Sequence, residues 1–217
     1  MKTLSTLLLA LALVAGAGSP VMAQTAKKTA ATAKKATTAG IAKSEMTDAR
    51  CLGLYGPVKT VKITSNANGE TQVTTYKFNA KGQLTSATMW GNTETYTWST
   101  DTRYKKGSTP VVITYGKNKR VDTEDVGESL STTYIFNANG QLTTINRNMW
   151  LAESTSKYLY KTTSDKLPYK ESSSGIDEGE EWSDTSTFQY LSTDSHGNWT
   201  KRKVNGKYTE TQVITYY

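Results

Sequence analysis

The chain has 217 residues with a single cysteine and a single histidine, so its composition excludes an internal disulfide and a zinc site built from these two residue types. Lysine and arginine number 26 against 19 aspartates and glutamates, a net charge of +7. Six of the basic residues and none of the acidic ones precede residue 45, which leaves 20 against 19, or +1, for residues 45–217. Without a basic excess there, nucleic-acid binding by a folded domain is excluded.

The chain opens with a basic residue, Lys2, followed by an uncharged apolar run, Leu4–Ala17, and by small side chains at the −3 and −1 positions of a cleavage point. This pattern is typical of a secretory signal, predicted to occupy residues 1–23 and to be cleaved between Ala23 and Gln24. The apolar run is shorter than the roughly 18 residues that a membrane helix requires. We therefore expect export to the periplasm or cell exterior, with no transmembrane span after cleavage.

Residues 24–44 consist almost entirely of Ala, Lys and Thr, with five lysines and no acidic residue. Such a segment buries too little apolar surface to offset its conformational entropy, so it is predicted to be a disordered basic tether. Its charge would serve either contact with anionic envelope polymers or simple solvation of a spacer. The folded domain is predicted to span residues 45–217. Its cysteine, Cys51, lies far beyond Ala23, whereas a lipid anchor would directly follow the apolar run, and it is predicted to be an inert buried thiol.

One hairpin unit is the template for that domain. Alternation places Tyr76 and Phe78 on one face of a strand. The tetrad Asn79–Gly82 then reverses the chain, because Asn favours the start of a turn and Gly accepts the positive φ that closes it. A second strand and a Gly91-Asn92 turn lead into a third strand that contains Tyr96-Thr97-Trp98.

The unit recurs along the chain. Asn137–Gly140 repeats the turn, and Asp194–Gly197 repeats it again after an almost equal interval. A fourth tetrad, Asn66–Gly69, has the same four residue types as the second copy. A repeated turn with repeated flanking alternation indicates a repeat architecture. The predicted structural turn residues are Asn66, Gly69, Asn79, Gly82, Asn137, Gly140, Asp194 and Gly197.

The segment F-N-A-K-G-Q-L-T-S-A-T, followed by a Gly turn and Tyr-x-Trp, resembles the Tyr-Asp (YD, or Rhs-type) repeat. The segments L-Y-G-P-V-K-T-V-K and D-S-H-G-N-W-T-K-R are similar to those of small secreted Bacteroidetes-type proteins with degenerate copies of that repeat. Large members of the family wrap such strands into a closed shell around a cargo. This chain is too short for that function to be carried over, and Asn replaces the usual Asp in two of the copies.

The remaining segments complete a nearly all-strand chain. Ser99–Thr109 is polar and is predicted to be a loop, Val111–Tyr115 a strand, and Ser172–Asp184, rich in Gly and acid, the longest irregular segment. No segment shows a sustained helical period. The predicted fold is all-β: an antiparallel meander of repeated β-hairpins forming a twisted sheet, with its curling toward a barrel or a sandwich left open.

Candidate chemistry is sparse. The cluster of acids near residue 180 could serve glycoside hydrolysis, which requires two carboxyl groups across a cleft, but its spacing does not match a calcium loop and a solvated loop is the alternative. No catalytic or metal-ligating residue is predicted from it. The cluster consists of Asp177, Glu178, Glu180, Glu181 and Asp184. His196, the single histidine, lies within a predicted turn.

Three tryptophans, Trp90, Trp98 and Trp199, are candidates for stacking on a flat ligand such as a sugar, with core packing as the alternative. The predicted function is that of an exported, non-enzymatic binding or surface-interaction module of the cell envelope, acting without a cofactor. Its expected partner is a glycan, an anionic envelope polymer or another envelope protein. One alternative is a glycan-acting hydrolase that uses the acidic loop 177–184. An outer-membrane barrel ranks last, because the faces opposite the aromatics carry Thr, Lys and Glu.

Overall fold

The computed structural model describes residues 40–67, 69–126 and 129–217, which belong to one compact unit, Gly40–Tyr217. The predicted signal and residues 24–39 of the predicted tether lie outside the described residues and stay predictions. No helix within the described ranges is long and apolar enough to cross a membrane.

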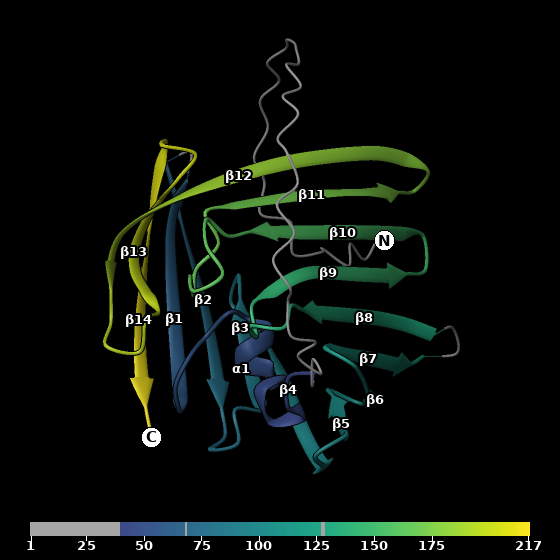
Figure 1. The fold of residues 1–217 in the computed structure, drawn as a ribbon. Coiled ribbons are helices and arrows are strands. Elements are labelled where there is room, and N and C mark those ends of the chain that lie inside the picture. Colours follow the sequence, from purple (N-terminus) through teal and green to yellow (C-terminus); the bar gives the residue numbers. More distant parts are fainter. Residues whose placement is uncertain (1–39, 68, 127–128) are drawn as a thin grey trace, which may run out of the picture. The chain divides into compact units, whose positions relative to one another are not determined.

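Fourteen antiparallel strands make up most of this described unit (Figure 1). They are β1 (Val58–Ala67), β2 (Glu70–Phe78), β3 (Leu84–Met89), β4 (Asn92–Thr100), β5 (Arg103–Lys106), β6 (Thr109–Gly116), β7 (Lys119–Asp125), β8 (Ser129–Phe136), β9 (Leu142–Met149), β10 (Ala152–Leu159), β11 (Lys170–Asp177), β12 (Glu180–Thr193), β13 (Trp199–Val204) and β14 (Tyr208–Tyr216). Each strand pairs with its neighbours in the chain, and β1 also pairs with β14, so the sheet closes into a barrel. The predicted all-β antiparallel meander of hairpins is confirmed. Of the two forms left open, barrel and sandwich, the structure has the closed barrel.

Two segments expected to be irregular are instead paired strands. Ser172–Asp184 forms the end of β11 and the start of β12, which pair up to Asp177 and Glu180 around a two-residue turn. Ser99–Thr109 contains β5, paired on both sides. These predictions were wrong because Ser, Gly and acidic residues have low intrinsic strand preference, whereas neighbouring strands of a closed sheet impose pairing on them.

The two faces of the sheet differ in chemistry. Along β14, Gln212, Ile214 and Tyr216 are partly or fully buried, while the alternating Thr211, Val213 and Thr215 are exposed. The same alternation runs along β4 and β12, with aromatic side chains inward and Thr, Ser or Gln outward. The barrel therefore encloses its tyrosines and presents a largely hydroxyl-bearing outer face.

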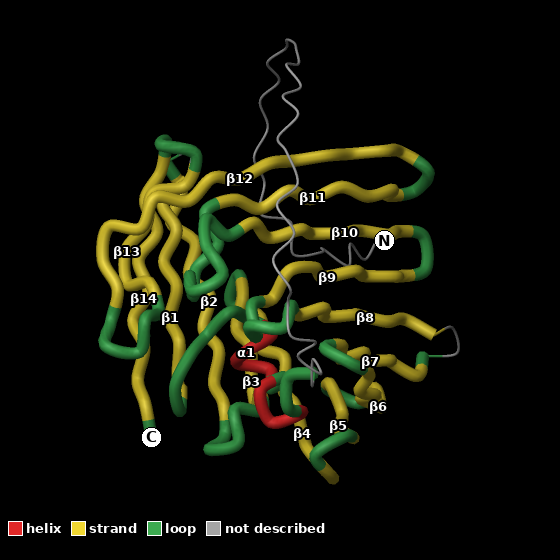
Figure 2. The backbone as a smooth tube through the Cα atoms, viewed as in Figure 1, coloured by secondary structure: helices red, strands yellow, loops and turns green. Residues whose placement is uncertain are grey.

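The core lies at one end of the barrel, where the segment Gly40–Pro57 (the plug segment) packs inside. It contains a short 3-10 helix, Lys43–Glu45, and one turn of α-helix, α1 (Asp48–Cys51), drawn in red in Figure 2. Met46 and Cys51 pack with one group of inward-facing residues: Phe136, Leu142 and Ile145. Ala49 and Leu54 pack with a second group: Val58, Val61 and Phe78.

The start of the plug segment lies within the predicted tether, 24–44. Ile41 packs against the first of these core groups, and its backbone N–H donates to Asn118 Oδ1 at 2.8 Å. The folded unit therefore begins at Gly40 rather than at 45, since an apolar side chain and a backbone hydrogen bond fix residues that composition alone assigns to the tether.

Candidate functional site

The first repeated turn is fixed by the side chain of Asn79. Its Oδ1 accepts hydrogen bonds from the backbone N–H groups of Lys81, at 3.0 Å, and Gln83, at 3.1 Å. Its Nδ2 donates to Gln83 Oε1 at 2.7 Å. Gly82 closes the turn with φ of 73°, a conformation that glycine adopts without strain.

The second and third copies reproduce this geometry. Asn137 Oδ1 accepts from the N–H groups of Asn139, at 2.9 Å, and Gln141, at 3.1 Å. Asp194 Oδ1 accepts from the N–H groups of His196 and Asn198, both at 2.9 Å. Gly140 and Gly197 have φ of 74° and 85°. A local motif repeated in sequence thus gives three turns of one geometry.

The fourth predicted tetrad, Asn66–Gly69, differs from these three. Asn66 lies within β1 and pairs with Thr71, and the pairing continues to Ala67 and Glu70. Asn66 and Ala67 are therefore the last residues of a paired strand, and this tetrad does not reproduce the geometry of the other three.

The three repeated turns lie at the plug end of the barrel and hold the plug segment. Gly82 O accepts from Ala49 N–H at 3.1 Å, and Gly140 O accepts from Arg50 Nη2 at 2.6 Å. In the third turn, Asn198 Oδ1 accepts from Tyr55 N–H and Nδ2 donates to Tyr55 O, both at 2.8 Å. Each copy of the repeat therefore contacts a successive part of the plug segment.

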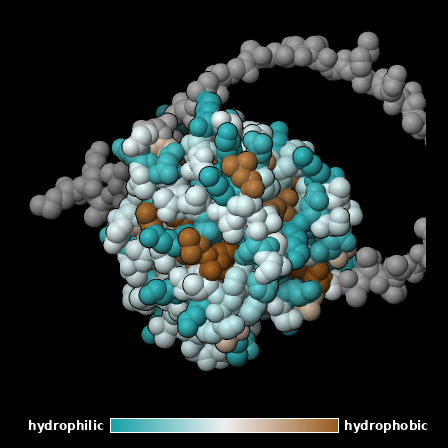
Figure 3. Space-filling model, turned by 90° about the vertical axis from the view of Figure 1, so that its left-hand side faces the viewer, coloured by the Kyte–Doolittle hydropathy of each residue, from teal (hydrophilic) through white to brown (hydrophobic). Residues whose placement is uncertain are grey.

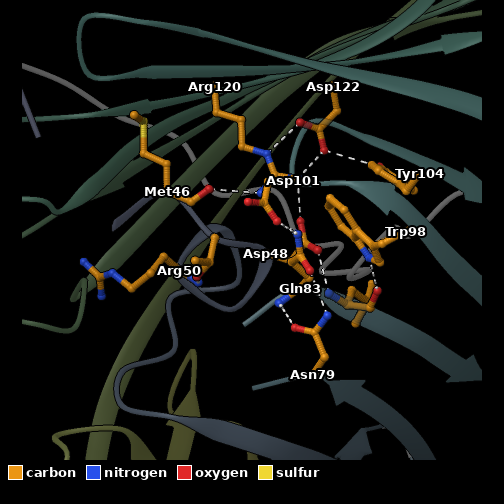
Figure 4. Close-up of polar contacts among 12 residues, drawn as sticks. Met46, Asp48, Arg50, Asn79, Gln83, Trp98, Asp101, Tyr104, Arg120 and Asp122 are labelled. Atoms are coloured by element: carbon orange, nitrogen blue, oxygen red, sulfur yellow. Dashed lines mark hydrogen bonds and ion pairs between the residues drawn. The ribbon is translucent and has the colours of Figure 1, made fainter. Parts of the chain in front are cut away.

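A buried ion network joins the plug segment to the barrel wall (Figure 4). Arg120 projects inward from β7 and is 2% exposed. Its Nε and Nη2 donate to the two carboxylate oxygens of Asp122, each at 2.7 Å, and its Nη1 donates to Met46 O at 3.0 Å. Nη2 also donates to Asp48, whose other oxygen accepts from Leu84 N–H at 2.6 Å. All charges and donors in the network have partners, so it serves to anchor the plug segment and is closed to ligands.

Three titratable groups at this end have pKa values shifted by burial or by hydrogen bonds. Burial raises the pKa of the Cys51 thiol well above its ordinary range, so the thiol stays protonated and inert. Burial and a hydrogen bond to Asp194 raise the pKa of Tyr216 to about 12. Burial alone would raise the pKa of Asp194, but hydrogen bonds from Tyr216, Asn198 and His196 outweigh it and hold that pKa below its usual value.

The three candidate stacking tryptophans do not come together. Trp199 is buried, with the Arg202 guanidinium 4.3 Å from its ring centroid. Trp98 stacks on Tyr104 at 4.6 Å and donates from Nε1 to Leu84 O at 2.8 Å. Trp90 is 51% exposed and lies in the turn between β3 and β4. Alternation turns Trp98 inward, whereas Trp199 is buried although it has the strand parity of the exposed Lys201 and Lys203.

The acidic cluster and the histidine lie at opposite ends of β12 and do not come together. Residues 177–181 lie at the exposed tip of the β11–β12 hairpin, and Asp184 faces inward on β12. The ring of His196 packs on Tyr216, 4.2 Å between centroids. Within the ranges 40–67, 69–126 and 129–217, no group of three or more acidic, His or Cys side chains is placed to hold a metal ion.

A shallow groove instead crosses the outward face of β8–β12. Its first part has a volume of about 480 Å³ and is lined by Ser131, Thr133, Asn146, Arg147, Asn148, Glu153, Ser154, Thr155, Ser174, Gly175 and Ile176. A second part of about the same volume continues it past Ser174 to Glu181, Trp182 and Ser183. At the floor, a Cβ on Gly175 would lie 2.1 Å from Glu153 O, so only glycine allows β10 and β11 to approach here.

Two outward rows of side chains, one residue from each strand, form the groove. One row is Ser131, Asn148, Glu153, Ile176 and Glu181, and the other is Thr133, Asn146, Thr155, Ser174 and Ser183. Trp150, 74% exposed, lies in the β9–β10 turn just past Asn148 and Glu153. Sequence reasoning missed this site. The available signal was the run of small hydroxyl and amide side chains at alternate positions of five consecutive strands.

No family model matches the chain, and no curated protein matches it. Among solved structures, a porin-like protein from Bacteroides vulgatus ATCC 8482 is 12% identical with a TM-score of 0.42, over 74% of this chain and 99% of that one. A porin-like protein from Bacteroides uniformis ATCC 8492 is 14% identical with a TM-score of 0.30, over 74% of this chain and 98% of that one. Both TM-scores are below 0.5, so the functional argument rests on the barrel and its groove alone.

Proposed function

We propose that the protein is an exported, non-enzymatic β-barrel that binds a neutral glycan chain in the groove across β8–β12. The observation that carries the proposal is the composition of the two rows that form the groove: seven of their ten side chains are Ser, Thr or Asn. Hydroxyl and amide groups both donate and accept hydrogen bonds, as the hydroxyls of a sugar do. Five strands at a spacing of about 4.8 Å give a track of roughly 19 Å, long enough for several sugar units.

Trp150 supplies the apolar element that glycan recognition uses. An exposed indole at the end of a polar track offers a flat face to the C–H surface of a sugar ring. Its position in a two-residue turn keeps it out of the core. This distinguishes it from Trp98 and Trp199, which pack within the barrel.

Hydrolysis of the glycan is the second candidate, because Glu153 and Glu181 stand in the same row of the groove with one strand between them. Two strand spacings, roughly 10 Å, separate their backbones, a distance that paired carboxyl groups of an inverting glycosidase could bridge. Both side chains are exposed, however, in a shallow groove rather than an enclosed cleft. Binding is therefore the better supported activity.

Export and repeat ancestry are parts of the same proposal. Export is supported by the basic, apolar and small-residue pattern of the predicted signal, Met1–Ala23. The relationship to Tyr-Asp repeats is supported by the nearly equal spacing and the shared turn geometry of Asn79, Asn137 and Asp194. Exported barrels of this kind would present the groove to polysaccharide of the envelope.

Titration calorimetry of the full mature chain against neutral hexasaccharides of glucose, xylose and mannose tests the proposal. Ser174→Tyr, which fills the middle of the groove, should abolish binding, and Trp150→Ala should weaken it at least about tenfold, or 1.4 kcal/mol. Thr95→Tyr places the same side chain on an exposed outward position of β4 and should bind as wild type. Equal affinity of Ser174→Tyr and wild type would refute the groove assignment. Release of reducing ends that Glu181→Gln abolishes would establish the hydrolase instead.

A further inference from the structure

On the side of the barrel opposite the groove, basic side chains gather on the outward face of the sheet and acidic side chains do not. Besides the exposed Lys59 at the bulge of β1, six basic residues alternate outward on the seven adjacent strands from β13 through β14 and β1 to β5: Lys62, Lys77, Arg103, Lys105, Lys201 and Lys203. All six are exposed. We call this outward surface the basic face. The near-neutral net charge of residues 45–217 conceals it.

The acidic residues of these strands point the other way. Glu94 pairs with the buried Ala87, and Glu210 accepts from Arg202 Nε at 2.7 Å inside the barrel. Glu70, the first residue of β2, shares the parity of the inward Tyr76. On the seven strands, all of which lie within the described residues, no acidic side chain alternates onto the basic face. None of its six basic residues forms an ion pair within the described part of the chain.

The basic charges are discrete and set among hydroxyls. Lys201 and Lys203 are two residues apart on β13, roughly 7 Å, and Lys62 is two strands away, at least roughly 10 Å. Thr209, Thr211 and other outward threonines fill the positions between them. A partner that matches this surface carries single negative charges separated by neutral, hydroxyl-bearing units.

We propose that the basic face binds a linear acidic polysaccharide, independently of the neutral groove. Its carboxylates would meet the lysines and its hydroxyls the threonines. A lipid surface fits less well, because Val73 and Val213 are the only large apolar side chains exposed on these seven described strands. The side of the molecule seen in Figure 3 shows several brown apolar groups set among white and teal residues rather than one continuous apolar surface. Nucleic acid fits less well too, because none of the aromatic side chains on these seven described strands is exposed to stack on bases.

Anion binding then belongs to the folded domain, whereas the sequence alone suggests it only for the basic tether, residues 24–44. A matched pair of variants of the full mature chain separates the two sources. The face variant, K62Q/K77Q/K201Q/K203Q, and the tether variant, K27Q/K28Q/K34Q/K35Q, each remove four positive charges. The four face substitutions lie at exposed positions.

Binding is measured by biolayer interferometry to immobilised polygalacturonate, with dextran as the neutral control. The face variant should lose at least tenfold in affinity at 0.1 M salt and the tether variant less than threefold. Wild-type binding should vanish at 1 M salt, where the Debye length falls from about 10 Å to about 3 Å. Ser174→Tyr should bind polygalacturonate as wild type, which separates failure here from failure of the groove.

Three results would overturn the inference. The tether variant could lose all binding while the face variant keeps it. Wild type could bind dextran as tightly as polygalacturonate. Phosphatidylglycerol vesicles or duplex DNA could be bound more tightly, with the same dependence on the face lysines. If the face variant melts at a lower temperature than the wild type, the single variants Lys62→Gln and Lys203→Gln are measured in its place. Each should lower the affinity about twofold or more.

Discussion

The two ends of the barrel turn the chain by different means. At the plug end, side chains of Asn79, Asn137 and Asp194 build the turns, and each turn contacts the plug segment or its surroundings. At the far end, short hairpins such as the two-residue turn at Gly91 and the three-residue turn at Gly206 reverse the chain with open space beyond them. Hairpins of this barrel therefore form without the repeated motif. The motif's distinctive contribution is to dock the plug segment.

The strongest test of that difference is removal of the plug-end ion network. Arg120→Met leaves Asp48 and Asp122 buried without their partner, which should lower the free energy of unfolding by about 3–5 kcal/mol. Urea unfolding followed by tryptophan fluorescence measures the loss. Lys81→Met, which breaks the exposed pair with Asp101, should leave the urea midpoint close to that of the wild type, because solvent screens an exposed pair. Equal midpoints for the two variants would mean that the plug segment adds nothing to the fold.

The next effect concerns the third turn. Asn198→Ala removes both side-chain hydrogen bonds to the Tyr55 backbone and should cost about 2–3 kcal/mol, because buried groups lose their partners. Asn66→Ala, at the far end, removes an exposed bond to Thr71 and should cost less than about 0.5 kcal/mol. The comparison fails if the two alanine variants unfold at the same urea concentration.

A smaller effect separates turn strain from docking. Gly82→Ala and Gly206→Ala both place a side chain at positive φ, a strain of about 1–2 kcal/mol each. At Gly82 the new Cβ would also lie 3.1 Å from Thr47 Oγ1, whereas at Gly206 it meets nothing. Gly82→Ala should thus be the less stable variant and should also expose Cys51 to a thiol reagent faster. If Cys51 reacts at the wild-type rate in both variants, the turn does not hold the plug segment.

The smallest effect appears only in acid. Because hydrogen bonds lower the pKa of Asp194 in the folded state, its contribution to stability is present above the unfolded value and is lost as pH falls below about 4. Asp194→Asn gives the third turn the residue of the first two, which do not titrate. Thermal melts should show that the melting temperature falls less between pH 7 and pH 3 for Asp194→Asn than for the wild type. An identical pH dependence would place the acid sensitivity elsewhere.

The sequence predicted features that lie within short segments, but not the contacts between residues far apart in the chain. The spacing of Asn79 and Asn137 and the alternation around Phe78 and Phe136 lie within short segments, so strands and turns could be recognised. The contact between Asp48 and Arg120 joins residues 72 positions apart, and that between Tyr55 and Asn198 joins residues 143 apart. No periodicity specifies which distant partner a side chain meets, so the plug segment and the closure were beyond prediction.

The residues of the candidate site were also not predicted from the sequence, because their exposure depends on the fold. The tryptophans were chosen by their place in alternating strands, yet both Trp98 and Trp199 are packed within the barrel. Trp150, in a turn, was the exposed one. The net charge of +1 for residues 45–217 is correct, but it did not predict the basic face. A net charge does not record which face of the sheet each charged side chain occupies.

Closure of the barrel by β1 and β14 sets the order in which the chain can fold. Every other strand pair joins neighbours in the chain, so thirteen ladders can form over short loops, whereas the closing ladder pairs residues as far apart as Val58 and Tyr216. Non-local pairing of this kind is slow, since a long loop must close before any bond is gained. Until the last strand has been synthesised, β1 and β13 present unpaired edges that can capture other chains. A chain that stops before residue 208 should therefore accumulate as aggregates rather than as a smaller barrel.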